Sequence, residues 1–157
     1  MSNKNIKLRG TTTNTVDPKG RFIIPKRFRD YFAGYAGSND NPLMVTYYSG
    51  ALHVYTEAEW EKREKKLLEN ETMSGQYQKL IDNYLGQVSE CRIDKQWRVL
   101  IPADLRALAG VKEDIVIVGL VYYFKVWDRE RYEAQRINFD QQVDSEEYQR
   151  VIREIGL

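Results

Sequence analysis

Two short stretches of the sequence combine acidic, basic and apolar residues in the same order. The first runs from Asp17 to Arg29, and the second runs from Asp94 to Arg106, 77 residues later. In each unit an aspartate precedes an arginine by four residues, and three apolar residues, a proline and a second arginine follow. Basic side chains beside a short strand can contact phosphate oxygens, and arginine can pair with base edges in a groove of DNA. Both units are therefore candidates for binding nucleic acid.

The same residues offer little capacity for catalysis. Asp17, Lys19 and Asp94 are candidate acid–base groups, but no nucleophile dyad, metal cluster or phosphate-binding loop accompanies them in the sequence. Cys91 is the only cysteine and His53 the only histidine. An intrachain disulfide is therefore impossible, and a zinc site is not expected. We expect a protein that is not an enzyme and that uses no cofactor or metal.

The positive charge of the chain is concentrated near its N-terminus. The 157 residues have a formal net charge of only +1, which by itself argues against a nucleic-acid partner. Residues 1–29, however, contain eight basic residues and one acid and carry +7, whereas residues 128–157 contain five arginines and eight acids. The basic residues of the first unit are Lys19, Arg21, Lys26, Arg27 and Arg29. The acidic tail thus masks a strongly basic first unit.

A turn, a short strand and a helix start are expected to position the basic side chains of each unit. Residues 17–20, Asp-Pro-Lys-Gly, have the chemistry of a tight turn, because proline fixes φ and glycine permits positive φ. Residues 22–24 and 99–101 are predicted to be short buried strands, and Pro25 and Pro102 stand where a helix can begin. A purely structural alternative is that aspartate and arginine pair across each turn while the other charges are solvated.

The similarity of the two halves extends beyond these units. Each unit is followed by a predicted β-hairpin, at residues 43–55 and 115–127, and then by a capped helix start at Thr56 or Asp128. Within the first hairpin His53 alternates with apolar residues, so its side chain is expected to point outward. An internal repeat of this length usually reflects a duplication whose halves pack about a pseudo-twofold axis.

Two further helices are expected outside the hairpins. One amphipathic pattern opens at Ser74 and closes at Gly86, and another, capped by Asp144, follows near the C-terminus. The apolar stripe of the last helix consists of Tyr148, Val151, Ile152 and Ile155. This stripe can dock on its own chain or on a neighbouring one. We divide the chain into a first repeat at 6–72, a linking helix at 73–86, a second repeat at 87–138 and a C-terminal helix at 139–157.

The paired units resemble those of the MraZ proteins. The resemblance is carried by Asp17-Pro-Lys-Gly-Arg21 and Asp94-Lys-Gln-Trp-Arg98, each followed by three apolar residues and proline. It extends to the helical region between the repeats and to the aromatic-rich hairpins. A single unit would be shared with swapped-hairpin DNA-binding proteins of the AbrB and MazE type, whereas two at this separation are specific. An antitoxin of the MazE type, with one unit and a disordered tail, fits less well.

The resemblance implies an α+β fold in which two tandem β-rich, swapped-hairpin (AbrB-like) repeats form a pseudo-twofold β-barrel core with peripheral helices. It implies a transcriptional regulator that assembles as a homo-oligomeric ring, an octamer or a dodecamer. Its partner would be double-stranded DNA with tandem short repeats, in the promoter of its own operon, the division and cell-wall gene cluster. The alternative function is an oligomeric ring scaffold whose basic edge binds an acidic protein.

A cytoplasmic, nucleoid-associated location is expected. No stretch approaches the roughly 18–20 apolar residues of a membrane span, and the first residues lack the apolar region of a signal peptide. Transferred position by position, the resemblance places DNA contacts at Lys19 and Arg21 in the first repeat and at Lys95 and Arg98 in the second. With the remaining basic residues of the first unit, the candidate DNA-binding residues are Lys19, Arg21, Lys26, Arg27, Arg29, Lys95 and Arg98.

The second unit departs from the pattern of the first. Trp97 stands where the first unit has Gly20, and Ala103 and Asp104 replace the basic pair at 26–27. If the turn needs positive φ, an aromatic residue there costs on the order of 1 kcal/mol or more. We therefore expect either that the second turn differs or that Trp97 packs against another group. We also expect the first repeat to do most of the DNA binding while the second is largely a scaffold.

Overall fold

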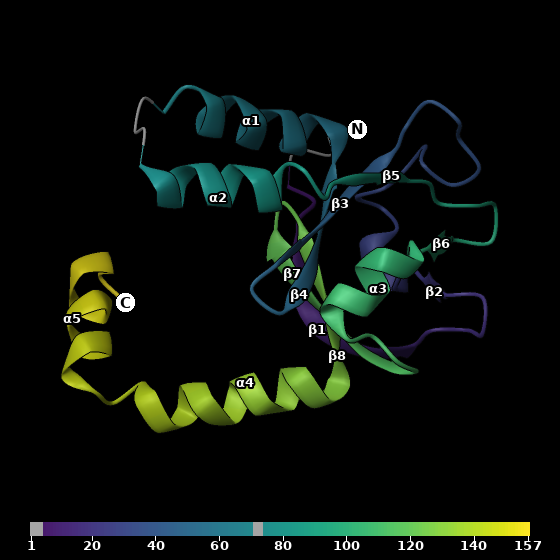
Figure 1. Cartoon of the computed structure of the whole chain (residues 1–157). Coiled ribbons are helices and arrows are strands. Elements are labelled where there is room, and N and C mark those ends of the chain that lie inside the picture. Colours follow the sequence, from purple (N-terminus) through teal and green to yellow (C-terminus); the bar gives the residue numbers. More distant parts are fainter. Residues whose placement is uncertain (1–4, 71–73) are drawn as a thin grey trace.

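The computed structural model describes residues 5–70 and 74–157 (Figure 1). Its strands are β1 (Leu8–Thr15), β2 (Arg21–Ile23), β3 (Leu43–Tyr48), β4 (Ala51–Thr56), β5 (Ser89–Cys91), β6 (Arg98–Leu100), β7 (Asp114–Val121) and β8 (Phe124–Asp128). Its helices are the 3-10 helix η1 (Lys26–Phe28) and the α-helices α1 (Glu57–Leu68), α2 (Gly75–Tyr84), α3 (Ala103–Ala109), α4 (Arg129–Gln142) and α5 (Glu146–Ile155). Within these residues no helix is both long and apolar enough to cross a membrane.

The two repeats exchange strands. Six strands form an antiparallel sheet in the order β1-β7-β8-β4-β3-β5, in which the two predicted hairpins, β3–β4 and β7–β8, meet through β4 and β8. Strand β1 of the first repeat pairs with β7 of the second, and β5 of the second repeat pairs with β3 of the first. The remaining strands, β2 and β6, pair with each other and form a separate two-stranded sheet. Each half thus completes the other, as a pseudo-twofold relation between the repeats requires.

The sheet does not close into the barrel that we expected. Strands β1 and β5 are the two edges of the six-stranded sheet, and no pairing joins them within the described residues. Strand β5 has only three residues, so it offers few backbone groups that could pair with β1. The fold is therefore α+β, as predicted, with an open sheet and a separate two-stranded ribbon.

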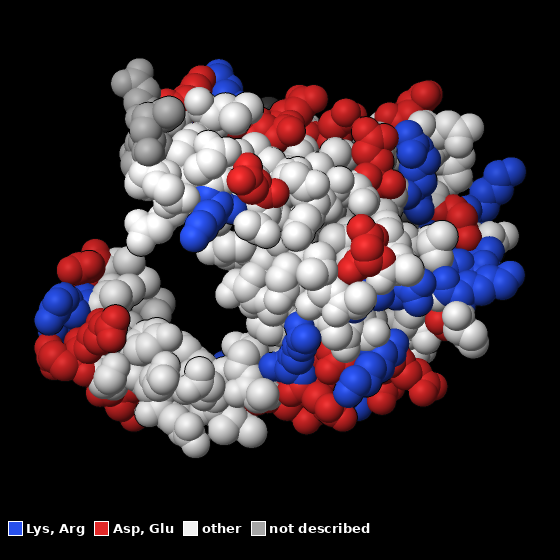
Figure 2. Space-filling model, viewed as in Figure 1, with Lys and Arg blue, Asp and Glu red and all other residues white. Residues whose placement is uncertain are grey.

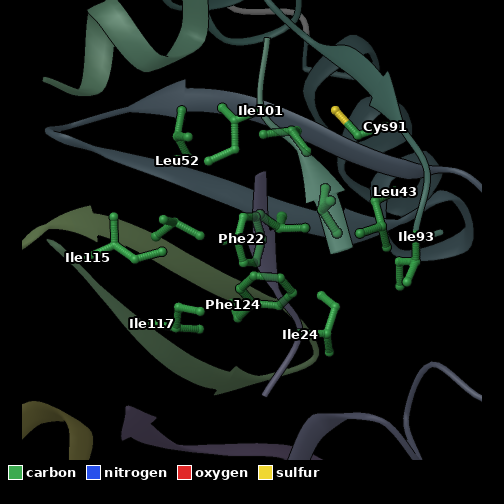
Figure 3. Close-up of a cluster of buried hydrophobic side chains, with 14 of the residues drawn as sticks. Phe22, Ile24, Leu43, Leu52, Cys91, Ile93, Ile101, Ile115, Ile117 and Phe124 are labelled. Carbon is green, nitrogen blue, oxygen red and sulfur yellow. The ribbon is translucent and has the colours of Figure 1, made fainter. Parts of the chain in front are cut away.

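The hydrophobic core fills the space between the six-stranded sheet and the ribbon. The ring of Phe124 lies 6.3, 5.8 and 6.0 Å from the rings of Phe22, Phe28 and Phe32, and all four side chains are buried. Figure 3 shows Phe22 and Phe124 together among aliphatic side chains from both repeats. Because Phe22 comes from β2, the core holds the inner face of the ribbon against the body.

The segment after Pro25 is not the α-helix that its sequence predicts. Only η1 forms, followed by turns, because the hydrogen bonds span three residues, from the Phe28 N–H to the Pro25 carbonyl and from the Tyr31 N–H to the Phe28 carbonyl. The second repeat has a true helix, α3, at the corresponding place, and it ends at Gly110 in the left-handed conformation. The first repeat uses the tighter path to bring Phe28 and Phe32 onto Phe124.

The expected outward orientation of His53 is wrong. Strand β4 lies inside the sheet, and a second cluster of aromatic side chains beneath α1 and α2 covers the face that we expected to be solvated. His53 stacks on Tyr123 with 5.5 Å between ring centroids, and its Nδ1 lies 3.3 Å from the hydroxyl of Tyr55. Burial lowers the pKa of the imidazole to about 3, so this side chain is neutral at physiological pH.

Strand β7 of the second hairpin continues to Val121, because β1 pairs with it along its whole length. One helix cap differs from the predicted one. The last helix is capped by Ser145, whose hydroxyl accepts a hydrogen bond from the Tyr148 N–H, and not by Asp144.

Helices α4 and α5 extend away from the sheet as an arm (Figure 1). The ring of Tyr148 contacts Phe139 of α4, with 5.7 Å between ring centroids. Further along the stripe of α5, Val151 and Ile155 are 47% and 68% exposed. Within residues 5–70 and 74–157, therefore, nothing covers most of Val151 and Ile155, whereas Tyr148 packs on α4.

Candidate nucleic-acid interface

The ribbon formed by β2 and β6 brings together the arginines of the two units. The register pairs Arg21 with Leu100, Phe22 with Val99, and Ile23 with Arg98. Because side chains alternate along a strand, Phe22 and Val99 share the inner face, and both are buried. Arg21 and Arg98 therefore share the outer face at diagonal positions, which in an antiparallel pair are roughly 7–8 Å apart.

The first turn is organised by Asp17. One carboxylate oxygen accepts hydrogen bonds from the backbone N–H groups of Lys19 and Arg21, at 3.0 and 2.9 Å. The other accepts from Nε of Arg21 at 2.7 Å. The backbone hydrogen bond from Arg21 is the main cause that lowers the pKa of this carboxyl below its ordinary value. The charged aspartate thus fixes Arg21 through Nε while the side chain remains 28% exposed.

The second turn repeats this geometry. One oxygen of Asp94 accepts from the N–H groups of Gln96 and Arg98, at 2.8 and 2.9 Å, and the other accepts from Nε of Arg98 at 2.7 Å. Burial acts to raise the pKa of Asp94, but the hydrogen bonds from Arg98 outweigh it, and the net direction is downward. One contact differs, because Nη2 of Arg98 also donates to the Gln96 side chain at 3.3 Å. The aspartate–arginine pairs that the structural alternative supposed are therefore present in both units.

Trp97 adopts the backbone conformation of a glycine. Its φ is +64° and that of Gly20 is +92°, and each residue donates its N–H to the carbonyl of the turn aspartate. Of the two alternatives expected for the second unit, the structure shows the second: its turn matches the first, and Trp97 packs against another group. The guanidinium carbon of Arg29 lies 5.4 Å from the centroid of the Trp97 ring, a favourable cation–π distance.

The second arginine of each unit supports the turn of the other repeat. Nε of Arg29 donates to the Ile24 carbonyl at 3.2 Å, and Nε of Arg106 donates to the corresponding Ile101 carbonyl at 3.0 Å. As Arg29 lies over Trp97, so Arg106 lies against Gly20, where an added Cβ would come within 2.6 Å of its guanidinium carbon. The sequence showed neither contact, because each joins residues nearly 70 or more positions apart.

The other candidate residues lie around the ribbon rather than on it. Lys19 and Lys95 are exposed in the two turns, with the stem of Lys95 against Gly37. Lys26 and Arg27 belong to η1, and the side chain of Arg27 lies over a glycine of β1. Figure 2 shows that basic side chains gather on the side of the molecule where the two turns project, at the right of the view.

The predicted strands of both units are only half buried. Ile23 and Leu100 were expected inside the protein, but they are 49% and 54% exposed on the outer face of the ribbon. Because side chains alternate between the two faces of a strand, Ile23 and Leu100 lie on the same outer face as the arginines in both units. Hydropathy alone predicts each run of three apolar residues as one buried segment and gives no sign that its middle residue is exposed.

Similarity to known proteins identifies the family. The family model described as "MraZ protein, putative antitoxin-like" matches residues 8–82 and 84–153. The chain belongs to the MraZ family. The two matched segments are two copies of the repeat, which confirms the predicted duplication. MraZ proteins are a family of regulators and not of enzymes, which agrees with the expectation from the sequence.

Several relatives carry the name "Transcriptional regulator MraZ". The protein of Desulfosudis oleivorans is 39% identical over 149 residues, which cover 95% of this chain and 99% of that protein. The protein of Desulforapulum autotrophicum is 38% identical with the same coverage. The protein of Limosilactobacillus fermentum is 32% identical over 136 residues, 84% of this chain and 91% of that protein.

The strained turn of this MraZ family member gives a stability prediction. Trp97→Ala and Trp97→Gly both remove the indole from Arg29, but only glycine adopts a φ of +64° without strain. The left-handed conformation costs alanine about 1–2 kcal/mol, against an advantage of roughly 0.4–1 kcal/mol from its less flexible unfolded chain. We expect the glycine variant to be the more stable of the two by about 0.5–1 kcal/mol in urea denaturation. An alanine variant that equals or exceeds it would show that the turn is not strained.

Proposed function

We propose that the protein is a sequence-specific DNA-binding transcriptional regulator whose β2–β6 ribbon enters the major groove. The observation that carries this proposal is that Arg21 and Arg98, from different repeats, lie on one outer face of an antiparallel ribbon. The major groove accommodates a two-stranded ribbon, and an arginine fork pairs with O6 and N7 of guanine. The name of the relatives supports the same reading.

The aspartate of each turn prepares its arginine for this role. Asp17 and Asp94 bind Nε of Arg21 and Arg98, so each side chain is held in place by a bond that does not involve its terminal nitrogens. An arginine that is already ordered loses less conformational entropy when it pairs with a base. Lys19 and Lys95, exposed in the two turns, are suited to phosphate contacts that set the position of the ribbon.

The remaining basic residues have different parts in the proposal. Lys26 and Arg27 are exposed on η1 and would add phosphate contacts in the first repeat alone. Arg29 is half-buried against Trp97 and the Ile24 carbonyl. Its main contribution would be to stabilise the turn that contains Trp97, and a contact with DNA would be less important.

We further propose that the protein acts as a homo-oligomeric ring, an octamer or a dodecamer, on tandem short repeats in the promoter of its own operon, the division and cell-wall cluster. Val151 and Ile155, the exposed part of the α5 stripe, support self-association, because exposed apolar faces can mark interaction sites. The division into two repeats, a linking helix and a C-terminal helix belongs to the same proposal. Such a regulator would be cytoplasmic and associated with the nucleoid.

Selection of bound fragments from a random DNA pool tests the function. We expect enrichment of a short repeated motif, and an affinity for it that falls steeply as salt rises, because phosphate contacts release counterions. The competing function is a ring scaffold whose basic edge binds an acidic protein. Recovery of unenriched DNA, together with salt-sensitive binding of an acidic protein, would favour the scaffold and contradict the regulator.

A further inference from the structure

The outer face of the ribbon carries two aliphatic side chains as well as the two arginines. Ile23 lies across from Arg98 and Leu100 across from Arg21, so that each arginine has an aliphatic residue of the other repeat beside it. Ile23 is 49% exposed and Leu100 is 54% exposed. Single exposed apolar residues are common on proteins and need no function. These two differ because the register places both of them on the face that the proposed function directs at DNA.

The chemistry of the major groove suggests what they contact. Base edges there present hydrogen-bond donors and acceptors, and the one apolar group among them is the C5-methyl group of thymine. A branched aliphatic side chain at this face can cover that methyl group, whereas it would leave a polar base edge without a partner. We propose that Ile23 and Leu100 contact thymine methyl groups next to the bases paired with Arg98 and Arg21. This inference rests on the proposed DNA-binding function.

A contact between copies of the chain is the other use of such residues. The charges on the face argue against it, because Arg21 and Arg98 flank the aliphatic pair. Two copies meeting through this face would bring four guanidinium groups together, and like charges across an interface are unfavourable. The charged groups within the ribbon's own turns, Asp17 and Asp94, are already paired with these arginines. A polyanion that also presents methyl groups fits the face better than a second copy does.

The test uses the full chain and the DNA motif selected from the random pool. Each thymine of the motif is replaced in turn by deoxyuridine, which removes only the methyl group. We expect about fourfold weaker binding at one or two thymines of each repeat, the effect of losing one buried methyl-sized group. Ile23→Ala and Leu100→Ala should bind the thymine motif more weakly and should each lose the preference for thymine over uracil at one position. Ile137→Ala, at an isoleucine of α4 that is 59% exposed, is the matched control and should keep the preference.

The outcomes separate this inference from the function on which it rests. Selective binding that is equally tight with uracil at every position, or a preference that survives both Ile23→Ala and Leu100→Ala, would overturn the methyl contact alone. A change in the mass of the assembly in these variants, with the thymine preference kept, would overturn it in favour of a contact between copies. Absence of any selective DNA binding would overturn the proposed function and the inference together.

Discussion

Arg21→Ala is expected to weaken binding to the selected DNA by about 1–3 kcal/mol, roughly a five- to 150-fold rise in Kd. Arg21 is the first residue of β2, is held by Asp17 through Nε, and stands beside the exposed Lys19. Arg98→Ala should have a smaller effect, because Nη2 of Arg98 is shared with the Gln96 side chain. Titration of labelled DNA at fixed salt measures both losses.

Two controls separate DNA contact from folding of the turn. Arg21→Lys keeps the charge but loses the planar fork, so we expect it to retain nonselective binding and to lose discrimination between bases. Arg150→Ala removes an exposed arginine of α5 and should leave the affinity unchanged. Thermal denaturation of each variant verifies that the ribbon is intact. A larger loss from Arg98→Ala than from Arg21→Ala would refute the leading role of the first repeat.

Tandem DNA repeats are expected to bind about 10²–10⁴-fold more tightly than a single repeat, provided that the protein is an oligomer. One ribbon makes few contacts, so a single repeat should be bound weakly, whereas linked copies reach the next repeat at high effective concentration. DNA fragments with one, two and four repeats at constant total length measure the gain. Equal affinity for one repeat and for several would contradict it.

The apolar stripe of α5 supplies the variant that isolates this effect. Val151→Asp combined with Ile155→Asp places two charges on a face that is now exposed, so the fold of one chain should survive. We expect a smaller assembly in sedimentation, an unchanged affinity for one repeat and loss of the gain from tandem repeats. Leu68→Asp, at a leucine of α1 that is 66% exposed and outside the stripe, is the matched control. A double variant that keeps both its mass and its tandem gain would show that the stripe does not hold the oligomer.

The turns and hairpins could be predicted because their signals are local. Asp17, Pro18 and Gly20 specify a turn within four residues, and the second turn follows the same pattern around Asp94. The pairing of β2 with β6 joins residues 75 to 79 positions apart and has no local signal. Once that pairing is known, the alternation of side chains along each strand shows which residues lie on the inner face and which on the outer face. The sequence alone therefore indicated the arginines but neither the ribbon nor its exposed aliphatic residues.

The failures have the same origin. Alternation predicts an outward side chain only where one face of the sheet meets water. His53 lies in β4, a strand in the interior of the sheet whose second face is covered by α1, α2 and their aromatic residues. Similarly, Arg29 was counted with the DNA-binding residues because of its charge, while its contact with Trp97 depends on the packing of the two repeats. Such contacts between distant residues decide which basic side chains remain available.

The exchange of β1 and β5 between the repeats has a consequence for how this chain arose and can change. Neither half contains all the partners of its own strands, so a lone half would need a second copy to fold. The stability of such a dimer would depend on the protein concentration. Joining the halves in one chain removes that dependence. It also frees the two copies to accumulate different substitutions, since a change in one is no longer imposed on the other. Gly20 and Trp97, which share one conformation and have different neighbours, are such a divergent pair.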